Sequence, residues 1–370
     1  MKISSSMISA GKPMLIKFKT RFQRASFFFI PALLGLLLGA CQRGPEIVKI
    51  SGAKLGTTYH ITVVADQPAP ADLDIRLAAI IDSVDNAMST YKVESELSRF
   101  NRAQVDDRQP ISAEFAEVVA ISLKVWRASD GALDPTVGPL VNLWGFGPDL
   151  TDDQIPAQEA IAEALAKTGF ERLQLHDDDG QMYLEKSAPV ALDLSAVAKG
   201  YAVDLIADYL EMLALPDYLV ELGGEVRVSG SNPDGQPWKV AIETPTLLGG
   251  VEQVIHLQAK ALATSGDYRN YFERDGRRYS HTIDPRSGYP IDHPLASVTV
   301  IMQRCAEADA WATAFMVMGD EQAIETADRF GVAMYMLVRD GEGFSVRSSR
   351  AFDAYLVRPE SQNSATATLN

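Results

Sequence analysis

Residues 193–201, DLSAVAKGY, form the junction between a predicted strand and a predicted helix, and the other segments of the fold are described relative to it. They follow an apolar stretch that ends at Leu192, and apolar residues then recur with helical spacing from 196 to 214. We therefore expect a strand over 181–192 that leads into a helix over 196–214. A helix that starts directly after a strand presents backbone N–H groups that can bind an anion.

The polar side chains at this junction allow two interpretations. Asp193 and Ser195 can act as helix caps, which would give them a purely structural role. Lys199 lies in the first turns of the helix, where a cation opposes the helix dipole. Its position indicates a negatively charged partner and favours a binding site at this end of the helix.

The segments on both sides of this junction mix helices and strands in no regular order. The predicted helices are 72–88, 113–130, 157–168, 196–214, 306–318 and 320–330. The predicted strands are 47–64 as a hairpin around Gly56, 171–176, 181–192, 218–229, 238–243, 252–264, a hairpin through Asp275-Gly276, 332–338 and 343–348. Because no steady βαβ alternation is present, the pattern predicts an α+β fold of mixed sheets with packed helices.

Charge is distributed unevenly along the 370 residues, which carry a formal net charge of -15. Residues 1–40 contain six Lys or Arg and no Asp or Glu, which leaves 28 basic and 49 acidic residues in the remainder, a formal charge of -21. An acidic body argues against general nucleic-acid binding. The basic, acid-free start is instead typical of a targeting segment.

The apolar part of that start is Phe27 to Ala40, FFFIPALLGLLLGA. It is too short to span a bilayer comfortably, and a buried helix is disfavoured by Pro31 and by the cationic residues that precede it. The stretch ends Leu38-Gly39-Ala40-Cys41 and resembles the lipobox of bacterial lipoproteins, whose cysteine is acylated. We predict a signal peptide over 1–40, with Met7 or Met14 as alternative start sites, and lipidation of Cys41.

The chain has two cysteines, so lipidation of Cys41 leaves Cys305 without a disulfide partner. We expect Cys305 to be a small buried residue, and the fold to depend on its apolar core.

Three further segments are rich in residues that can bind ligands or take part in catalysis. Residues 131–147, GALDPTVGPLVNLWGFG, place Asp134 among glycines that allow close approach of a ligand, although a long structural loop is the alternative. Residues 264–288 contain His281 and Asp284 after an Asp-Gly turn, and His281 is the histidine with the most polar surroundings.

The third segment, 305–319, has Asp309 and Thr313 four residues apart on one helix face. A carboxylate and a hydroxyl are hard ligands that suit Mg²⁺, although this spacing often occurs by chance in a core helix. The CxxC, HExxH, GxGxxG and Walker A motifs do not occur, so the metal, redox and nucleotide sites that those motifs form are excluded.

Taken together, these segments resemble the ApbE family, the FAD:protein FMN transferases of bacterial envelopes. The similarity covers residues 51 to 350. It is carried by LGTTY at 55–59, STY at 89–91, the 131–147 segment, DLSAVAKGYAVD at 193–204, ELGGE at 221–225, SGDY at 265–268, HTIDP at 281–285 and ADAWAT at 308–313. The family often has Met at the position of Leu55, and Thr or Glu at those of Ala196 and Lys199.

This resemblance implies a reaction with two substrates. FAD is cleaved at its pyrophosphate with the help of Mg²⁺, AMP leaves, and the FMN phosphoryl group passes to a Thr or Ser hydroxyl of a partner protein. The implied FAD-binding residues are Leu55, Tyr91, Ala132, Leu133, Asp134, Asp193, Lys199 and Ile283. The implied metal ligands are Ala196, through its carbonyl, Asp309 and Thr313.

A base near the acceptor hydroxyl assists such a transfer, and His281 or Asp284 can serve. We favour His281, because the ordinary pKa of histidine lies near neutral pH. We also expect Asp309 to lie on a helix surface facing a cleft, so that its replacement by Ala leaves the fold intact.

Two other functions use the same residues. An FAD pyrophosphatase would pass the FMN phosphoryl group to water, and a flavin-binding lipoprotein would cleave nothing. The metal-ligand pair argues against the simple binder.

The predicted parts are the signal peptide, a lipidated tether at 41–50, an ApbE-like domain at 51–357 and a disordered tail at 358–370. The resemblance implies an acceptor in a membrane electron-transfer system, and a catalytic domain that faces the periplasm. The lipid anchors the chain to a membrane, with the inner membrane favoured over the outer.

Overall fold

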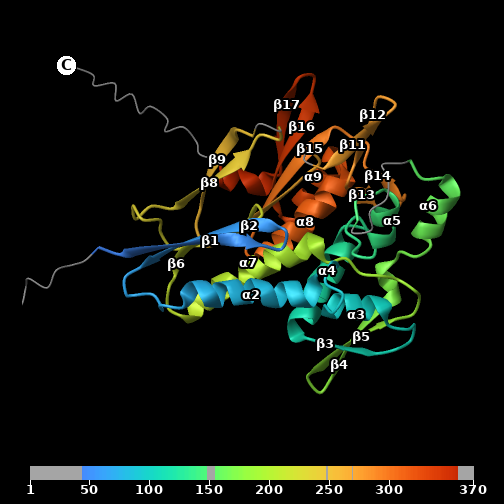
Figure 1. Ribbon diagram of the computed structural model, residues 1–370. Coiled ribbons are helices and arrows are strands. Elements are labelled where there is room, and N and C mark those ends of the chain that lie inside the picture. The colour runs from blue at the N-terminus through green and yellow to red at the C-terminus, as the bar shows by residue number, and fades with distance from the viewer. Residues whose placement is uncertain (1–43, 148–154, 247–248, 269, 357–370) are drawn as a thin grey trace, which may run out of the picture. The chain divides into compact units, whose positions relative to one another are not determined.

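The main sheet is assembled from strands that lie far apart in the sequence. The computed structural model describes residues 44–147, 155–246, 249–268 and 270–356 (Figure 1). Eight strands pair antiparallel throughout, in the order β1-β2-β6-β7-β10-β15-β16-β17. They are β1 (Glu46–Lys54), β2 (Thr57–Ala65), β6 (Asp217–Leu222), β7 (Glu225–Ser229), β10 (Lys260–Gly266), β15 (Leu295–Met302), β16 (Ala333–Asp340) and β17 (Gly343–Ser348).

Four smaller sheets surround the main one. They are β3-β5-β4, formed by β3 (Gln109–Ile111), β5 (Gln181–Lys186) and β4 (Leu173–Asp178), and the pairs β8 (Trp238–Glu243) with β9 (Val251–Leu257), β11 (Tyr271–Arg274) with β12 (Arg277–Ser280), and β13 (Ile283–Asp284) with β14 (Tyr289–Pro290).

The helices pack mainly through α7 and α8, which contact each other and the main sheet (Figure 1). The α-helices are α2 (Leu73–Met88), α3 (Glu96–Arg102), α4 (Ala113–Ala128), α5 (Gly138–Leu143), α6 (Gln158–Leu165), α7 (Ser195–Met212), α8 (Cys305–Met318) and α9 (Asp320–Phe330), and the 3₁₀ turns are η1 (Phe170–Arg172) and η2 (Arg350–Ala354). Helix α8 lies against β10 and β15, α4 contacts both α7 and α8, and α2 contacts α7.

Side-chain alternation along the strands divides the core into two parts. In β10, Ala261 and Ala263 belong to the large core shared with the helices, whereas Leu262 belongs to a smaller core covered by β8, β9 and η2. This is the two-residue period of a strand buried on both faces. The small side chains of β10 face α8 and allow the helix to approach the sheet closely.

The sequence predictions of helices are confirmed. Each of the six predicted helices is present with its ends within three residues of the expected ones, and the fold is α+β with mixed helices and sheets. The hairpins at Leu55-Gly56 and Asp275-Gly276 are also present, and all four turn residues have positive φ angles, as expected for two-residue hairpin turns.

The predicted strand at 181–192 is wrong in its second half, since β5 ends at Lys186. Leu192 donates its backbone N–H to the side chain of Asn101, and its carbonyl accepts from the same side chain. An asparagine amide therefore takes the place of a neighbouring strand, and the segment before α7 is an extended connection.

Two other predicted strands are each divided in two. Residues 218–229 form β6 and β7, joined by a turn at Gly223 and Gly224, which both have positive φ angles. Residues 252–264 form β9 and β10, which belong to different sheets. Helix α5 was missed, because it lies within the glycine-rich 131–147 segment.

The predicted signal peptide, Cys41 and the C-terminal tail lie outside the described residues. Strand β1 begins at Glu46, so the last residues of the predicted tether form part of the main sheet. Among the described residues, none of the helices combines the length and apolar character required to cross a membrane.

Candidate active site

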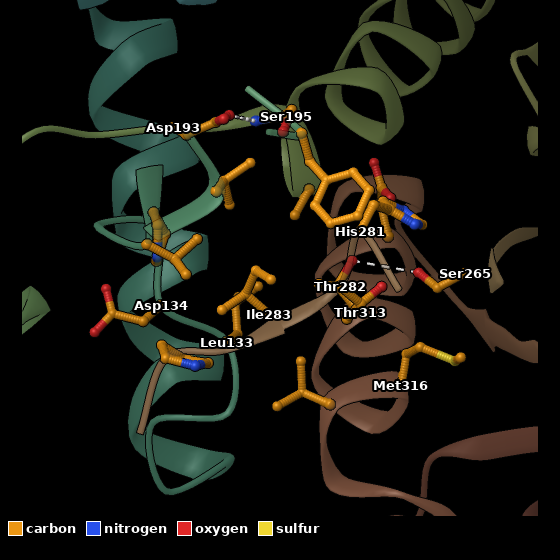
Figure 2. A pocket seen from close by; sticks show the side chains of 18 of the residues that line it. Leu133, Asp134, Asp193, Ser195, Ser265, His281, Thr282, Ile283, Thr313 and Met316 are labelled. Atoms are coloured by element: carbon orange, nitrogen blue, oxygen red, sulfur yellow. Dashed lines mark hydrogen bonds between the residues drawn. The ribbon is translucent and has the colours of Figure 1, made fainter. Parts of the chain in front are cut away.

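A cavity of about 440 Å³ lies where the start of α7, the face of α8 and the loops 131–147 and 281–285 meet (Figure 2). All but two of the predicted site residues of the domain line it. They are Tyr91, Ala132, Leu133, Asp134, Asp193, Ala196, Lys199, His281, Ile283, Asp309 and Thr313. Tyr91 is 77% exposed and lies where the cavity meets solvent.

The two exceptions are Leu55 and Asp284. Leu55 occupies the β1–β2 turn with a φ of 52° and packs against the main core. The carboxylate of Asp284 accepts hydrogen bonds from Nε and Nη2 of Arg286, at 2.9 and 3.0 Å, and from the Arg286 backbone N–H. A carboxylate paired in this way stabilises the turn after β13, and Asp284 does not line the cavity, whereas His281 does.

Asp134 lines the cavity but directs its carboxylate away from it (Figure 2). The carboxylate accepts hydrogen bonds from the backbone and hydroxyl groups of Thr136, at 2.8 and 2.5 Å, and from the N–H of Phe170 at 3.3 Å. Burial raises the pKa of Asp134, and these hydrogen bonds act against the rise. Asp134 therefore fixes the loop so that Ala132 and Leu133 form the cavity wall.

The start of α7 is tied to this loop. The N–H of Asp193 donates to the carbonyl of Pro135 at 2.7 Å, and the Asp193 carboxylate accepts from the Ser195 N–H at 2.9 Å. Leu194 is the N-cap residue, and no side-chain hydrogen bond caps the helix. The capping interpretation thus holds in part for Asp193, which orders the turn that brings Ala196 and Lys199 to the cavity.

The negative partner expected for Lys199 is supplied by two carboxylates of the chain itself. The Lys199 Nζ lies 3.4 Å from Oε1 of Glu225 and 3.7 Å from Oδ2 of Asp309. Burial lowers the pKa of Lys199, but the two carboxylates more than offset this, so its pKa lies above the ordinary value. Burial also raises the pKa of Asp309 and of Glu225, and Lys199 acts against both shifts.

Asp309 is not a surface residue of its helix, contrary to the sequence expectation. It is 3% exposed, it lies between α7 and α8, and its Oδ2 accepts the Gly200 N–H at 3.1 Å. Thr313, one turn further along α8, has its hydroxyl 3.3 Å from that of Ser265 on β10 (Figure 2). Asp309 and Thr313 thus present to the cavity, from one helix face, oxygen atoms that can coordinate a cation.

His281 lies on the same side of the cavity as Thr313 (Figure 2). Its Nδ1 is 2.9 Å from the carbonyl oxygen of Asn270, and Phe146 contacts its ring edge to face. A carbonyl can only accept, so Nδ1 carries the proton and Nε2 carries a free lone pair. Burial lowers the pKa of His281, which favours this neutral form.

Comparison with known proteins identifies the family of this chain. The model of the ApbE family matches residues 55–336. The chain belongs to the ApbE family. Similar curated proteins include the FAD:protein FMN transferase of Haemophilus influenzae, 43% identical over 330 residues that cover 87% of this chain and 95% of that protein. The FAD:protein FMN transferase of Escherichia coli K12 is 42% identical and covers 84% and 90%.

Solved structures of ApbE proteins have the same fold. The apo form of the Pseudomonas stutzeri flavinyl transferase ApbE superposes with a TM-score of 0.78 at 41% identity, over 85% of this chain and 98% of that one. The Vibrio cholerae flavin transferase ApbE gives a TM-score of 0.77 at 40% identity, over 84% and 100%. The family resemblance and the α+β fold predicted from the sequence are thereby confirmed.

The residues of this ApbE site fit a hard divalent cation that takes few of its ligands from the protein. Among the described residues, no group of three or more His, Cys, Asp or Glu could hold a metal ion. The predicted set consists of one carboxylate, one hydroxyl and one backbone carbonyl, from Asp309, Thr313 and Ala196. Such a set suits Mg²⁺, which takes few protein ligands and completes its coordination with phosphate oxygens and water.

Two charged or polar residues of the site that contact predicted residues were not predicted from the sequence. Glu225 and Ser265 both line the cavity and contact predicted residues, Lys199 and Thr313 respectively. Each belongs to a motif that carried the family resemblance, ELGGE and SGDY. The motif was therefore the available signal, but the contacts arise only when strands β7 and β10 lie beside the helices.

Proposed function

We propose that this chain is an FAD:protein FMN transferase, which transfers the FMN moiety of FAD to a hydroxyl group of a target protein. The similar proteins that share its fold are flavin transferases. The observation that carries the proposal is the position of His281 in the cavity, with a free Nε2 lone pair on the same side as the oxygen donors of α8. A base and a pyrophosphate-binding surface in one cavity are what phosphoryl transfer requires.

In the proposed reaction, the hydroxyl oxygen of an acceptor Thr or Ser attacks the phosphorus of the FMN half. The bond from this phosphorus to the bridging oxygen breaks, and AMP leaves with that oxygen. The hydroxyl proton passes to Nε2 of His281, while the Asn270 carbonyl holds the ring through Nδ1. A group with a lowered pKa is ready to accept this proton at neutral pH.

The divalent-cation requirement is also part of the proposal. Asp309, Thr313 and the carbonyl of Ala196 would hold Mg²⁺, which when bound neutralises charge on the pyrophosphate oxygens. Lys199 adds a positive charge at the same wall of the cavity. The loop held by Asp134 and the side chain of Ile283 enclose the remainder of the FAD and limit access of water.

The acceptor is a protein, and we propose that it belongs to a membrane electron-transfer system. The exposed position of Tyr91 leaves the cavity accessible to a segment of another chain. We further propose that Cys41 is lipidated and anchors the chain to a bacterial membrane, preferably the inner one, with the catalytic domain in the periplasm. The basic leader and the lipobox-like sequence support this location.

The products formed from FAD test the function. Incubation with FAD and Mg²⁺ should release AMP in amounts that depend on an added acceptor protein. Release of AMP together with free FMN, whether or not an acceptor is present, would show a pyrophosphatase instead. Unchanged FAD in the presence of an acceptor would leave only a flavin-binding protein and would contradict the proposal.

A further inference from the structure

Glu225 is a buried carboxylate with an incomplete set of partners. It is the first residue of β7, directly after the Gly223-Gly224 turn, and it is 3% exposed. Its Oε1 faces the Lys199 ammonium, but none of the described residues forms a hydrogen bond with its Oε2. A buried carboxylate without full compensation is energetically costly, which indicates a functional reason for this position.

The Lys199 ammonium is shared between two buried carboxylates. It lies slightly closer to Glu225, at 3.4 Å, than to Asp309, at 3.7 Å, and it also donates to the carbonyl of Ser195 at 3.4 Å. The side chains of Glu225 and Asp309 are 4% and 5% exposed, so water screens this group of charges only weakly. When both carboxylates are ionised, the three side chains together carry one excess negative charge.

The distribution of the Lys199 ammonium between Glu225 and Asp309 determines whether the Asp309 carboxylate can bind another cation. An ammonium bound to Asp309 alone would oppose a divalent cation, both by occupying the carboxylate and by charge repulsion. With Glu225 present, the flexible Lys199 side chain has a second buried carboxylate within reach and can move toward it when Asp309 binds a metal. The ammonium then stays at the cavity wall and remains available to a phosphate group.

We propose that Glu225 is a positioning residue, which holds the Lys199 ammonium and thereby leaves the carboxylate of Asp309 available to a divalent cation. The inference rests on the metal site of the proposed function. It assigns Glu225 no contact with the metal, so its effect must act through Lys199. A direct ligand would act whether or not Lys199 is present, which gives the two roles different experimental signatures.

The test is Mn²⁺ binding to the full chain without FAD, measured from the electron paramagnetic resonance signal of free Mn²⁺. Glu225→Gln should weaken binding by about tenfold, and Lys199→Gln should strengthen it, because buried charged groups in contact are energetically coupled. In the Lys199→Gln background, adding Glu225→Gln should change the affinity by less than about threefold, as expected when the partner of the interaction is already absent.

Two further variants control for charge and folding. Glu221→Gln removes one negative charge from the same hairpin, where Glu221 contacts His60 and Gly224, and it should leave the Mn²⁺ affinity almost unchanged. Glu225→Asp keeps the charge and should retain most of the affinity. Urea unfolding of each variant should show a single cooperative transition, which establishes that the variant is folded under the conditions of the binding measurement.

The inference is overturned if Glu225→Gln binds Mn²⁺ as tightly as the parent chain. It is equally overturned if the weakening persists in the Lys199→Gln background, since Glu225 would then act as a ligand. If Asp309→Asn binds Mn²⁺ as well as the parent chain, the metal site of the proposed function fails and this inference fails with it.

Discussion

At the scale of single residues, the orientation of one imidazole ring determines what chemistry the site can perform. The Asn270 carbonyl assigns the proton to Nδ1 of His281, which leaves Nε2 as the acceptor. Asp284, the alternative considered from the sequence, is paired with Arg286 and does not line the cavity. The structure therefore places His281 and Asp284 in different surroundings, although both belong to the HTIDP motif.

Replacement of His281 by Asn should lower the rate of flavin transfer by about 10²- to 10⁴-fold, the usual contribution of a positioned general base. Asn can still interact with the Asn270 carbonyl but cannot accept the hydroxyl proton. The measurement is the transfer rate at saturating Mg²⁺ and FAD. Transfer by His281→Asn at nearly the parent rate would show that another group accepts the proton.

The pH dependence of transfer should reflect the same residue. Because burial lowers the pKa of His281, its neutral form persists below the ordinary histidine pKa of about 6.5. The rate should therefore stay constant as the pH falls toward that value, and should decline only below it, when Nε2 becomes protonated. A profile of kcat/KM for the acceptor from acid to neutral pH gives the midpoint, and a midpoint above that of free histidine would contradict the assignment.

At the scale of secondary-structure elements, the face of α8 that lines the cavity is positioned by a residue of the neighbouring helix. The carboxylate of Asp204 on α7 accepts the backbone N–H groups of Cys305 and Ala306, at 2.9 and 3.0 Å. It also pairs with Arg227, and the side chain is 0% exposed. Asp204 thus caps α8 across the helix pair and sets its position relative to the cavity.

Replacement of Asp204 by Ala should lower the free energy of unfolding by about 3–5 kcal/mol, because it breaks a buried ion pair and leaves the buried N–H groups of Cys305 and Ala306 without their acceptor. Asp208 provides a matched control, since it pairs with the same arginine but its side chain is 54% exposed. Asp208→Ala should cost no more than about 1 kcal/mol. Urea unfolding measures both, and equal losses would show that the cap is not the stabilising contact.

At the scale of the whole molecule, the sequence predicts that a removable export signal is joined to an acidic domain at Cys41. A lipidated Cys41 should keep the chain in the membrane fraction, because the acidic domain is itself repelled by anionic lipid headgroups. Cys41→Ser should move the protein to the soluble periplasmic fraction. Cys305→Ala is the matched control, since Cys305 is buried and should not affect location. Retention of Cys41→Ser on salt-washed membranes would contradict the lipid anchor.

Much of the fold can be predicted from the sequence, because its helices have strong apolar periodicity and its hairpins have recognisable turn residues. Errors occur where a side chain replaces a strand, as Asn101 does beside Leu192. The site is predictable as a set of motifs, and most of its residues do line one cavity. Their individual roles are not predictable in this way, since the burial of Asp309 and its sharing of Lys199 with Glu225 depend on how α7, α8 and β7 pack.

The central claim is the transfer of FMN to a protein hydroxyl, and the mass of an acceptor protein tests it most directly. The chain is incubated with FAD, Mg²⁺ and an acceptor subunit of a membrane electron-transfer system, and the intact acceptor is analysed by mass spectrometry. We predict that the acceptor gains one FMN moiety on a Thr or Ser, and that replacement of this residue by Ala abolishes the gain. An acceptor of unchanged mass, with FAD either intact or converted to free FMN and AMP, would contradict the account.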